Sequence, residues 1–160
     1  MTAPAIYAGP RSDEWETPAW IFNPLHDQYR FAVDLAATKH NTKTYKWLDS
    51  FLTAPFWDGV GWCNPPFSLA SEFFAEIATQ SNLHSAQCVA IYKSANMETK
   101  SWRHIFSSCS WIAHPHKRVN YLVDGVEGKG AQFASAVIGW NVPPPRVPWK
   151  HTLLRVEASR

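Results

Sequence analysis

The segment VGWCNPPF, residues 60–67, joins a short apolar strand to a rigid turn. Its valine and tryptophan are typical of a buried strand, and its two prolines fix the φ angles of the turn that follows. The next stretch, residues 68–81, places Leu69, Phe73 and Ile77 on one face of an amphipathic helix. A strand, a turn and a helix in this order predict one unit of an α/β sheet.

Strands and helices continue to alternate outward from this unit. Upstream, Thr17 fits an N-cap with Pro18 at the first helical position. The other expected elements are strands at 31–37, 87–93, 110–115, 119–123 and 133–140, a helix at 99–108, and an edge strand or a frayed end at 151–159. A long glycine-rich loop joins the fourth and fifth of these strands and fits an antiparallel hairpin. We therefore predict a compact single α/β domain, residues 14–160, with a C-terminal antiparallel hairpin and a flexible arm at residues 1–13.

Length and composition restrict the class of protein. A chain of 160 residues with 46% hydrophobic and 18% charged residues is typical of one globular domain rather than a disordered chain. No apolar run reaches the roughly 18–20 residues of a membrane span, and the first residues lack the apolar core of a secretory signal. The three cysteines and seven histidines lack the spacing of a disulfide framework or a metal site. We therefore expect a reduced, cytoplasmic protein with no bound metal and no membrane contact.

The turn formed by Asn64, Pro65, Pro66 and Phe67 carries the clearest chemical signal. The Asn64 side-chain oxygen and the Pro65 carbonyl can each accept one N–H of an exocyclic amine, which frees the nitrogen lone pair to attack an electrophilic methyl group. The Phe67 ring can stack on a flat heterocycle and hold it in register. The alternative is an ordinary proline-rich turn. No metalloprotease, P-loop or Ser-His-Asp pattern is present, which disfavours hydrolases and NTP-driven enzymes.

Basic side chains are frequent in the second half of the chain, although a net charge of +2 is not that of a strongly basic nucleic-acid-binding protein. Some of them follow expected strands, where the loops of an α/β sheet usually bind ligands. The candidates for contact with nucleic-acid phosphates are Lys93, Ser94, Lys100, Arg103, Lys117 and Arg118. The alternative is a solvated face, which is the usual meaning of scattered charges.

Five segments carry a family resemblance in their order and length. They are ETP at 16–18, FAVDLAATKHNTK at 31–43, GWCNPPFS at 61–68, HKRVNYLVDG at 116–125 and GAQFASAVIGW at 130–140. Together they resemble the phage-type, Dam-like DNA N6-adenine methyltransferases over roughly residues 12–140. The resemblance implies a Rossmann-like fold and S-adenosylmethionine as the methyl donor. It also implies that a DNA adenine is flipped out of the duplex into the NPPF pocket.

The resemblance also implies which residues hold the donor. Thr17 and Pro18 match the motif that contacts its methionine end, and Asp34 matches the acidic residue that pairs with its ammonium group. Ala36 lies in the turn LAAT, where general Rossmann-like methyltransferases have glycines, so the backbone contacts stay open. Asp49 is a candidate for the ribose hydroxyls or the adenine amine. From the residues alone, an ordinary helix cap and a solvated strand-end aspartate are the alternatives.

The resulting hypothesis is an adenine-specific DNA methyltransferase, which acts in the host cytoplasm if a phage encodes it. Arg118 matches the arginine of the family's GR-type motif, with Lys117 in place of the glycine. We expect DNA sequence to be read by loops such as 94–103 or 124–131, to be read only loosely, or to be read by a second subunit of an oligomer. Two other hypotheses stay open: a methyltransferase that acts on RNA adenine or a protein amide, and a non-catalytic DNA-binding relative.

Overall fold

The computed structural model describes residues 15–38, 41–48, 51–52, 56–127 and 133–154. Its helices within these ranges are α2 (Ala19–Tyr29), α3 (Ala70–His84) and α4 (Lys100–Phe106), with a 3₁₀ turn at Phe67–Leu69. Its strands there are β1 (Val33–Asp34), β2 (Val60–Cys63), β3 (Gln87–Lys93), β4 (Trp111–His114), β5 (Leu122–Val123), β6 (Val126–Glu127), β7 (Ser135–Trp140) and β8 (Lys150–Leu153). The expected arm at residues 1–13 lies outside the described residues.

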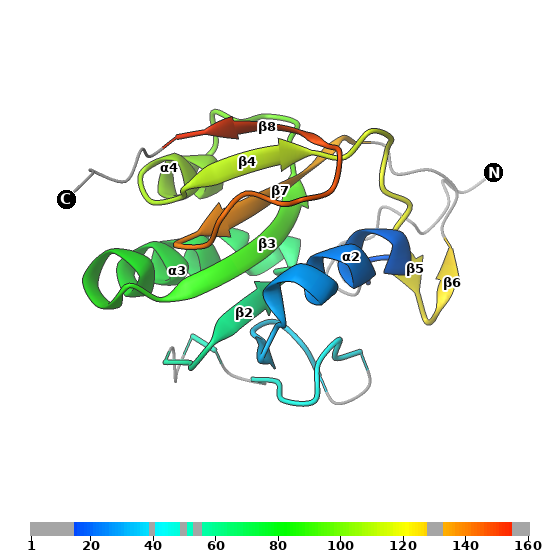
Figure 1. The fold of residues 1–160 in the computed structure, drawn as a ribbon, viewed down its shortest axis with the longest axis horizontal. Coiled ribbons are helices and arrows are strands. Elements are labelled where there is room, and N and C mark those ends of the chain that lie inside the picture. The colour runs from blue at the N-terminus through cyan, green and yellow to red at the C-terminus, as the bar shows by residue number, and fades with distance from the viewer. Residues whose placement is uncertain (1–14, 39–40, 49–50, 53–55, 128–132, 155–160) are drawn as a thin grey trace.

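Six of these strands form one sheet in the order β1-β2-β3-β7-β4-β8, and β5 pairs with β6 separately. Strands β1, β2 and β3 are parallel. Strand β7 runs antiparallel between β3 and β4, and β8 runs antiparallel to β4. Because β7 opposes both of its neighbours, β4 points in the same direction as β1, β2 and β3, as Figure 1 shows for β2, β3 and β4. The predicted α/β class is therefore confirmed.

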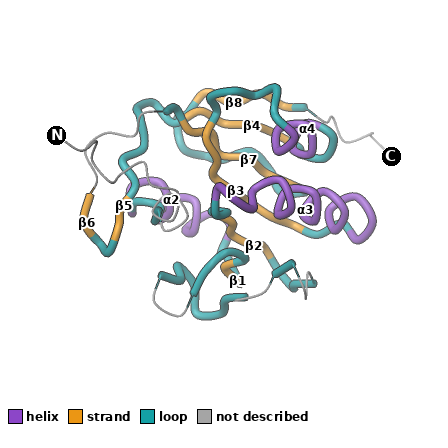
Figure 2. Tube along the Cα trace, turned by 180° about the vertical axis from the view of Figure 1, so that it is seen from behind, coloured by secondary structure: helices purple, strands orange, loops and turns teal. Residues whose placement is uncertain are grey.

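Helices cover both faces of the sheet, with α2 on one face and α3 and α4 on the other (Figures 1 and 2). Alternate residues of β3 therefore belong to two apolar cores. Val89 and Ile91 pack with α2, whereas Cys88, Ala90 and Tyr92 pack with α3 and α4. All five side chains are buried, so β3 is a central strand that is protected from water on both faces.

The start of α2 differs from the prediction. Thr17 is not its N-cap, because the helix begins at Ala19 after Pro18 and no side chain caps its first N–H groups. The Pro18 carbonyl accepts hydrogen bonds from the backbone N–H groups of Ile21 and Phe22, at 3.1 Å each. Proline fits this place because the start of a helix has no use for the N–H group that proline lacks.

The expected hairpin between residues 119–123 and 133–140 is wrong. Strand β7 lies between β3 and β4 instead, and all of its residues are buried. The chain turns earlier, at Asp124 and Gly125, whose φ angles of 52° and 74° suit the two-residue turn between β5 and β6. The Asp-Gly pair fixes a local hairpin, whereas the partners of a strand that is apolar on both faces depend on the whole sheet.

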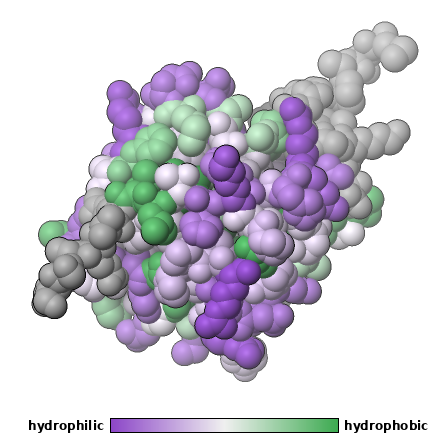
Figure 3. All heavy atoms as spheres, turned by 45° about the horizontal axis from the view of Figure 1, so that its top comes forward, coloured by the Kyte–Doolittle hydropathy of each residue, from purple (hydrophilic) through white to green (hydrophobic). Residues whose placement is uncertain are grey.

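The outer surface is mainly polar. Figure 3 shows hydrophilic side chains over most of one face, with hydrophobic side chains gathered mainly in one patch. In the part of the chain that the structure describes, no helix has both the length and the apolar composition needed to cross a membrane.

Candidate functional site

Candidate residues from separate parts of the chain meet at one edge of the sheet. Because β1, β2, β3 and β4 point in the same direction, their carboxyl ends lie along this edge. Asp34 ends β1, Asn64 follows β2 and Lys93 ends β3. Lys117 and Arg118 come shortly after β4. In open α/β sheets this carboxyl edge is where ligands bind.

Asn64 is positioned by a residue that is distant in the sequence. Its side-chain Nδ2 donates a hydrogen bond of 2.7 Å to the backbone carbonyl of Trp15. Just after Asn64, the Pro66 carbonyl accepts from the Leu69 backbone N–H at 3.0 Å, which begins the 3₁₀ turn before α3. The predicted succession of strand, rigid turn and helix is confirmed.

Aromatic rings from separate parts of the chain surround Phe67. This aromatic cluster consists of Trp15, Phe67, Tyr92, Tyr121 and Phe133. Phe67 meets Trp15, Tyr92 and Phe133 edge to face, with ring centroids 5.5, 5.6 and 5.5 Å apart. The Trp15 indole in turn stacks on Phe133 and Tyr121, at centroid distances of 5.2 and 5.6 Å. The aromatic cluster is joined to Asn64 through Trp15, whose carbonyl accepts the Asn64 hydrogen bond.

Lys93 lies against this cluster. Its Nζ is 5.0 Å from the centre of the Phe67 ring, which is the geometry of a cation–π contact. Sequence reasoning predicted a phosphate contact for Lys93 and missed Trp15 and Phe133 altogether. The sequence signal for these two was only the unusual number of tryptophans, nine in the whole chain, together with its other aromatic residues.

A small polar cleft of about 20 Å³ lies at the same edge. It is lined by Trp15, Glu16, Thr17, Asp34, Ala36, Asn41, Lys43, Trp62 and Asn64. The cleft thus brings together four residues of the predicted site, from three separate parts of the chain. Within the described ranges, no group of three or more His, Cys, Asp and Glu side chains could hold a metal ion.

Asp34 is a buried carboxylate in the polar cleft. It is 3% exposed, and its oxygens accept hydrogen bonds from the backbone N–H groups of Ala36 at 3.2 Å and Lys43 at 3.0 Å. Burial raises the pKa of Asp34 to about 6, against the lowering effect of these N–H groups and of the Lys43 charge. At neutral pH Asp34 is therefore an ionised group with little water contact, which suits a bound cation.

Thr17 is buried in the same cleft. It is 1% exposed, and its hydroxyl oxygen has no hydrogen-bond partner among the described residues. Such an orphaned polar group costs about 1–3 kcal/mol, which a polar ligand atom would recover. Pro18 follows it at the start of α2, and Asp49 lies outside the described residues.

The remaining basic candidates are exposed, with Lys100 and Arg103 on α4 and Lys117 and Arg118 after β4. The Lys117 Nζ lies 4.7 Å from the centre of the Trp20 ring at the start of α2. The Ser94 backbone N–H donates to the Ala134 carbonyl at 2.8 Å, which ties the end of β3 to the start of β7. Contact between these residues and DNA stays a prediction.

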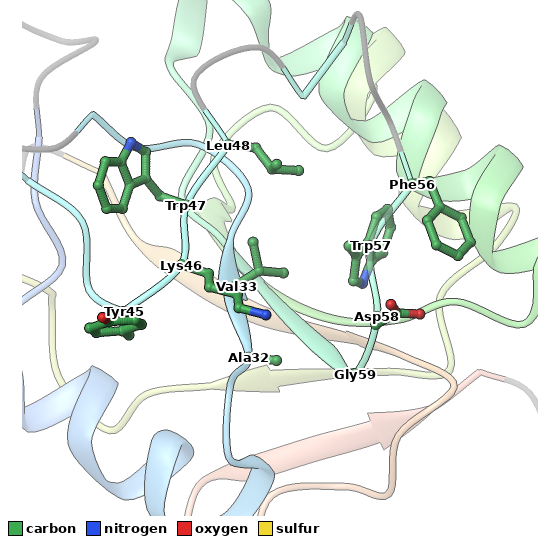
Figure 4. A pocket seen from close by; sticks show the side chains of 10 residues that line it. All are labelled: Ala32, Val33, Tyr45, Lys46, Trp47, Leu48, Phe56, Trp57, Asp58 and Gly59. Atoms are coloured by element: carbon green, nitrogen blue, oxygen red, sulfur yellow. The ribbon is translucent and has the colours of Figure 1, made fainter.

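A larger pocket, of about 600 Å³, lies beside β1, the edge strand of the sheet (Figure 4). This edge pocket is lined by Ala32, Val33, Tyr45, Lys46, Trp47, Leu48, Phe56, Trp57, Asp58 and Gly59. Val33 lines the edge pocket while Asp34 lines the polar cleft, because successive side chains of a strand point to opposite faces. None of the described residues predicted for the site lines the edge pocket.

The fold and this edge define a class of protein before any comparison. This is an α/β protein whose candidate ligand site lies where its co-directional strands end. The family model described as "DNA N-6-adenine-methyltransferase (Dam)" matches residues 7–137. The chain belongs to this family, which confirms the resemblance in its sequence.

Two curated proteins are similar to parts of the chain. The "DNA N-6-adenine-methyltransferase" of Haemophilus phage HP1 is 32% identical over 84 residues, which are 49% of this chain and 49% of that protein. "Leucine aminopeptidase 2" of Yarrowia lipolytica is 29% identical over 141 residues, which are 83% of this chain and 21% of that protein. The chain therefore spans about half the length of the phage relative and about a fifth of the yeast relative.

Proposed function

We propose that the chain transfers a methyl group from S-adenosylmethionine to N6 of an adenine in DNA. The observation that carries this proposal is the hydrogen bond from Asn64 Nδ2 to the Trp15 carbonyl. A carbonyl only accepts hydrogen bonds, so the amide nitrogen faces Trp15 and the side-chain oxygen is left for the target amine. Membership of the family and the name of the phage relative support the same activity.

The Asn64-Pro65 step would act on the amine by hydrogen bonding alone. In a free adenine the N6 lone pair is delocalised into the ring, which makes the nitrogen a poor nucleophile. The Asn64 oxygen and the Pro65 carbonyl accept its two N–H groups and favour a pyramidal nitrogen with its lone pair free. The new bond would form between this nitrogen and the donor's methyl carbon while the bond from that carbon to the sulfonium sulfur breaks. The sulfur would keep the electron pair and leave as a neutral thioether, and the surplus proton would pass from the nitrogen to water. This is catalysis by orientation and fixed dipoles.

The polar cleft fits the amino-acid end of the donor, on the evidence of an orphaned hydroxyl beside a buried carboxylate. S-adenosylmethionine supplies, when bound, an electrophilic methyl group on a sulfonium. Asp34 would hold its ammonium group, and the Thr17 hydroxyl would bind its carboxylate near the start of α2. Ala36, which lines the same cleft, would lie beside the bound donor. A cleft of about 20 Å³ is too narrow for such a molecule, so binding must widen it.

The aromatic cluster would hold the target base. N6 is engaged in pairing inside a duplex, so the adenine has to leave the stack to reach Asn64. Phe67 is the expected stacking partner, and a base on its outer face takes the place of the Lys93 ammonium. Lys93 is then free to meet a backbone phosphate, which is the role that its position in the sequence predicts.

The architecture that we propose is the Rossmann-like form of an α/β methyltransferase. Three observations support it: the parallel order of β1, β2 and β3, the helices on both faces, and candidate donor residues at the end of β1. A domain of residues 14–160 remains our expectation for its extent.

The decisive experiment offers unmethylated DNA, RNA and a glutamine-rich protein to the chain with isotope-labelled S-adenosylmethionine. We expect label in DNA only, recovered by mass spectrometry as N6-methyladenine, and loss of that product in Asn64→Ala. Label in RNA or in a protein amide would replace the proposed substrate. Label in N4-methylcytosine would keep the chemistry and change the base. Donor binding without transfer would point to a non-catalytic relative.

A further inference from the structure

Trp15 and Asn64 are separated by 49 residues, yet their contact decides which end of the Asn64 amide faces the cleft. The two ends of an amide have nearly the same shape and opposite hydrogen-bonding character. Next to a carbonyl oxygen at 2.7 Å only the NH₂ end is acceptable, because two oxygen acceptors at that distance repel each other.

Trp15 is itself held in place by contacts of the next residue and of its own indole ring. The next residue, Glu16, exchanges two backbone hydrogen bonds with Leu122 of β5, at 2.8 and 2.9 Å. The Trp15 indole stacks on Tyr121 with an angle of 23° between the ring planes. Tyr121 is buried, and its hydroxyl shares a hydrogen bond of 2.7 Å with Ser135 at the start of β7. The carbonyl is therefore anchored to the sheet rather than to a loose segment.

We propose that Trp15 is a positioning residue for methyl transfer, because its carbonyl makes the site depend on an amide rather than a carboxylate at position 64. This inference rests on the proposed function. Acceptor chemistry alone predicts that Asn64→Asp stays active, since aspartate also offers an oxygen to the amine. Beside the Trp15 carbonyl, an ionised aspartate sets oxygen against oxygen. Only its protonated form can donate the bond that Nδ2 donates in the native chain.

The surroundings of position 64 contain other charged groups. Glu16, Asp34 and Lys43 line the same cleft, and Lys93 lies over the Phe67 ring. The buried phenols of Tyr92 and Tyr121 ionise only at high pH, because burial raises the pKa of both. All of these groups are the same in the native chain and in Asn64→Asp. A carboxylate at position 64 would also interact with Asp34 in the same cleft, so the melting comparison below is repeated in an Asp34→Asn background, where the pH-dependent difference reports mainly on position 64.

The first test compares the pH profiles of methylation for the native chain and Asn64→Asp between about pH 5 and about pH 8. We expect Asn64→Asp to lose about 100-fold or more in kcat at the upper end, and to recover relative to the native chain as the pH falls. Equal kcat at the upper end overturns the inference. If the native chain itself is inactive, that result contradicts the proposed function instead. The role of the Trp15 carbonyl is then tested by a measurement that does not depend on activity.

That readout is the difference in melting temperature between the two proteins without donor. The carbonyl favours the protonated aspartate in the folded state, so its folded pKa lies above the unfolded one. Stability specific to Asn64→Asp is then lost as the pH rises from about 4 through that raised pKa. A difference in melting temperature that stays constant over this range overturns the inference whatever the activity.

A second pair of variants separates positioning from mere packing. Trp15→Phe keeps a ring against Tyr121, and we expect it to retain most of the turnover. Trp15→Ala should lower kcat by about tenfold or more while the melting shift induced by S-adenosylmethionine is retained. Trp47→Ala in the edge pocket is the control, with kcat unchanged. Loss of the melting shift in step with kcat in Trp15→Ala overturns the inference, because Trp15 would then only hold the cleft together.

Discussion

The polar cleft and the edge pocket lie on opposite sides of β1 and differ in what their residues need. The edge pocket is far larger, about 600 Å³ against about 20 Å³, and its Tyr45 and Phe56 are 96% and 69% exposed. The polar cleft instead buries the Asp34 carboxylate and the unpartnered Thr17 hydroxyl. Burying such groups opposes folding, whereas exposed aromatic rings oppose it little. A buried carboxylate beside an unpartnered hydroxyl, rather than pocket volume, is therefore our reason for placing the candidate donor site in the polar cleft.

The strongest test of this contrast is Asn64→Ala. The substitution removes one of the two acceptors for the amine, and we expect kcat to fall by about 100- to 1,000-fold, equivalent to roughly 2.7–4 kcal/mol. The melting shift induced by the donor should change little. Tyr45→Ala in the edge pocket is the matched substitution and should leave turnover as it is. A larger loss in Tyr45→Ala than in Asn64→Ala would move the chemistry to the edge pocket.

Asp34 gives the cleft a pH dependence. The pKa of about 6 means that most Asp34 side chains are protonated at pH 5 and ionised at pH 7, so donor affinity should rise by roughly tenfold over that range. Without donor the sign is reversed: the folded state favours the protonated carboxyl, and stability falls by at most about 3 kcal/mol as the pH rises from about 4 to about 6.

Asp34→Asn should abolish both effects, because the amide does not titrate in this range. Donor affinity is measured by calorimetry across the pH range, and stability by urea unfolding in the same buffers. Asp58→Asn, in the edge pocket, serves as the control and should keep the native pH dependence of both. Donor affinity that is independent of pH in the native chain would separate Asp34 from the ammonium group.

The basic residues after β4 test whether DNA binds near the carboxyl edge of the sheet rather than near the edge pocket. If Lys117 and Arg118 contact phosphates, replacing both by alanine should flatten the salt dependence of DNA affinity by about two units of slope, or roughly tenfold between about 50 and about 200 mM salt. The set of methylated sites should stay the same, because phosphate contacts carry no direct sequence information. Lys46→Ala in the edge pocket should leave the slope unchanged. An unchanged slope in the double variant would place DNA on another face.

Local signals in the sequence predicted much of the fold. The strand expected at 87–93 is β3 with the same bounds, and the helix expected at 68–81 corresponds to Ala70–His84. Both are long apolar patterns with one clear period, so neighbouring residues suffice to define them. The partners of β7 were predicted wrongly, because a strand that is apolar on both faces can pair at any interior position of a sheet.

The residues of the candidate site also divide into those with a local sequence signal and those without one. Asn64 and Asp34 are recognisable because each lies at the end of an apolar strand, where a polar residue meets the ligand edge. The part that we propose for Trp15 depends on the two backbone hydrogen bonds between its neighbour Glu16 and Leu122, and on the stacking of Trp15 on Tyr121, more than 100 residues further along the chain. No local pattern encodes such a contact. Thr17 is an intermediate case. Its residue type and position predicted a helix cap, whereas the structure buries its hydroxyl without a partner among the described residues.

The smallest expected effect comes from Thr17→Val. This substitution is informative because it should raise stability without donor and lower donor affinity. Valine keeps the branched shape and removes only the hydroxyl, which has no partner in the described structure. Without donor we expect the free energy of unfolding to rise by about 1 kcal/mol, because a buried unsatisfied group is gone. With donor the same change removes a hydrogen bond, so affinity should fall by about fivefold.

The control for this last prediction is Ser81→Ala. The Ser81 hydroxyl in α3 is also buried without a partner among the described residues, but Ser81 does not line the polar cleft. Its removal should raise stability in the same way and leave donor affinity as it is. Chemical unfolding with and without S-adenosylmethionine measures both quantities in one series. If Thr17→Val raises stability and donor affinity stays native, the orphaned hydroxyl is a packing defect and the donor's carboxylate binds elsewhere along the edge.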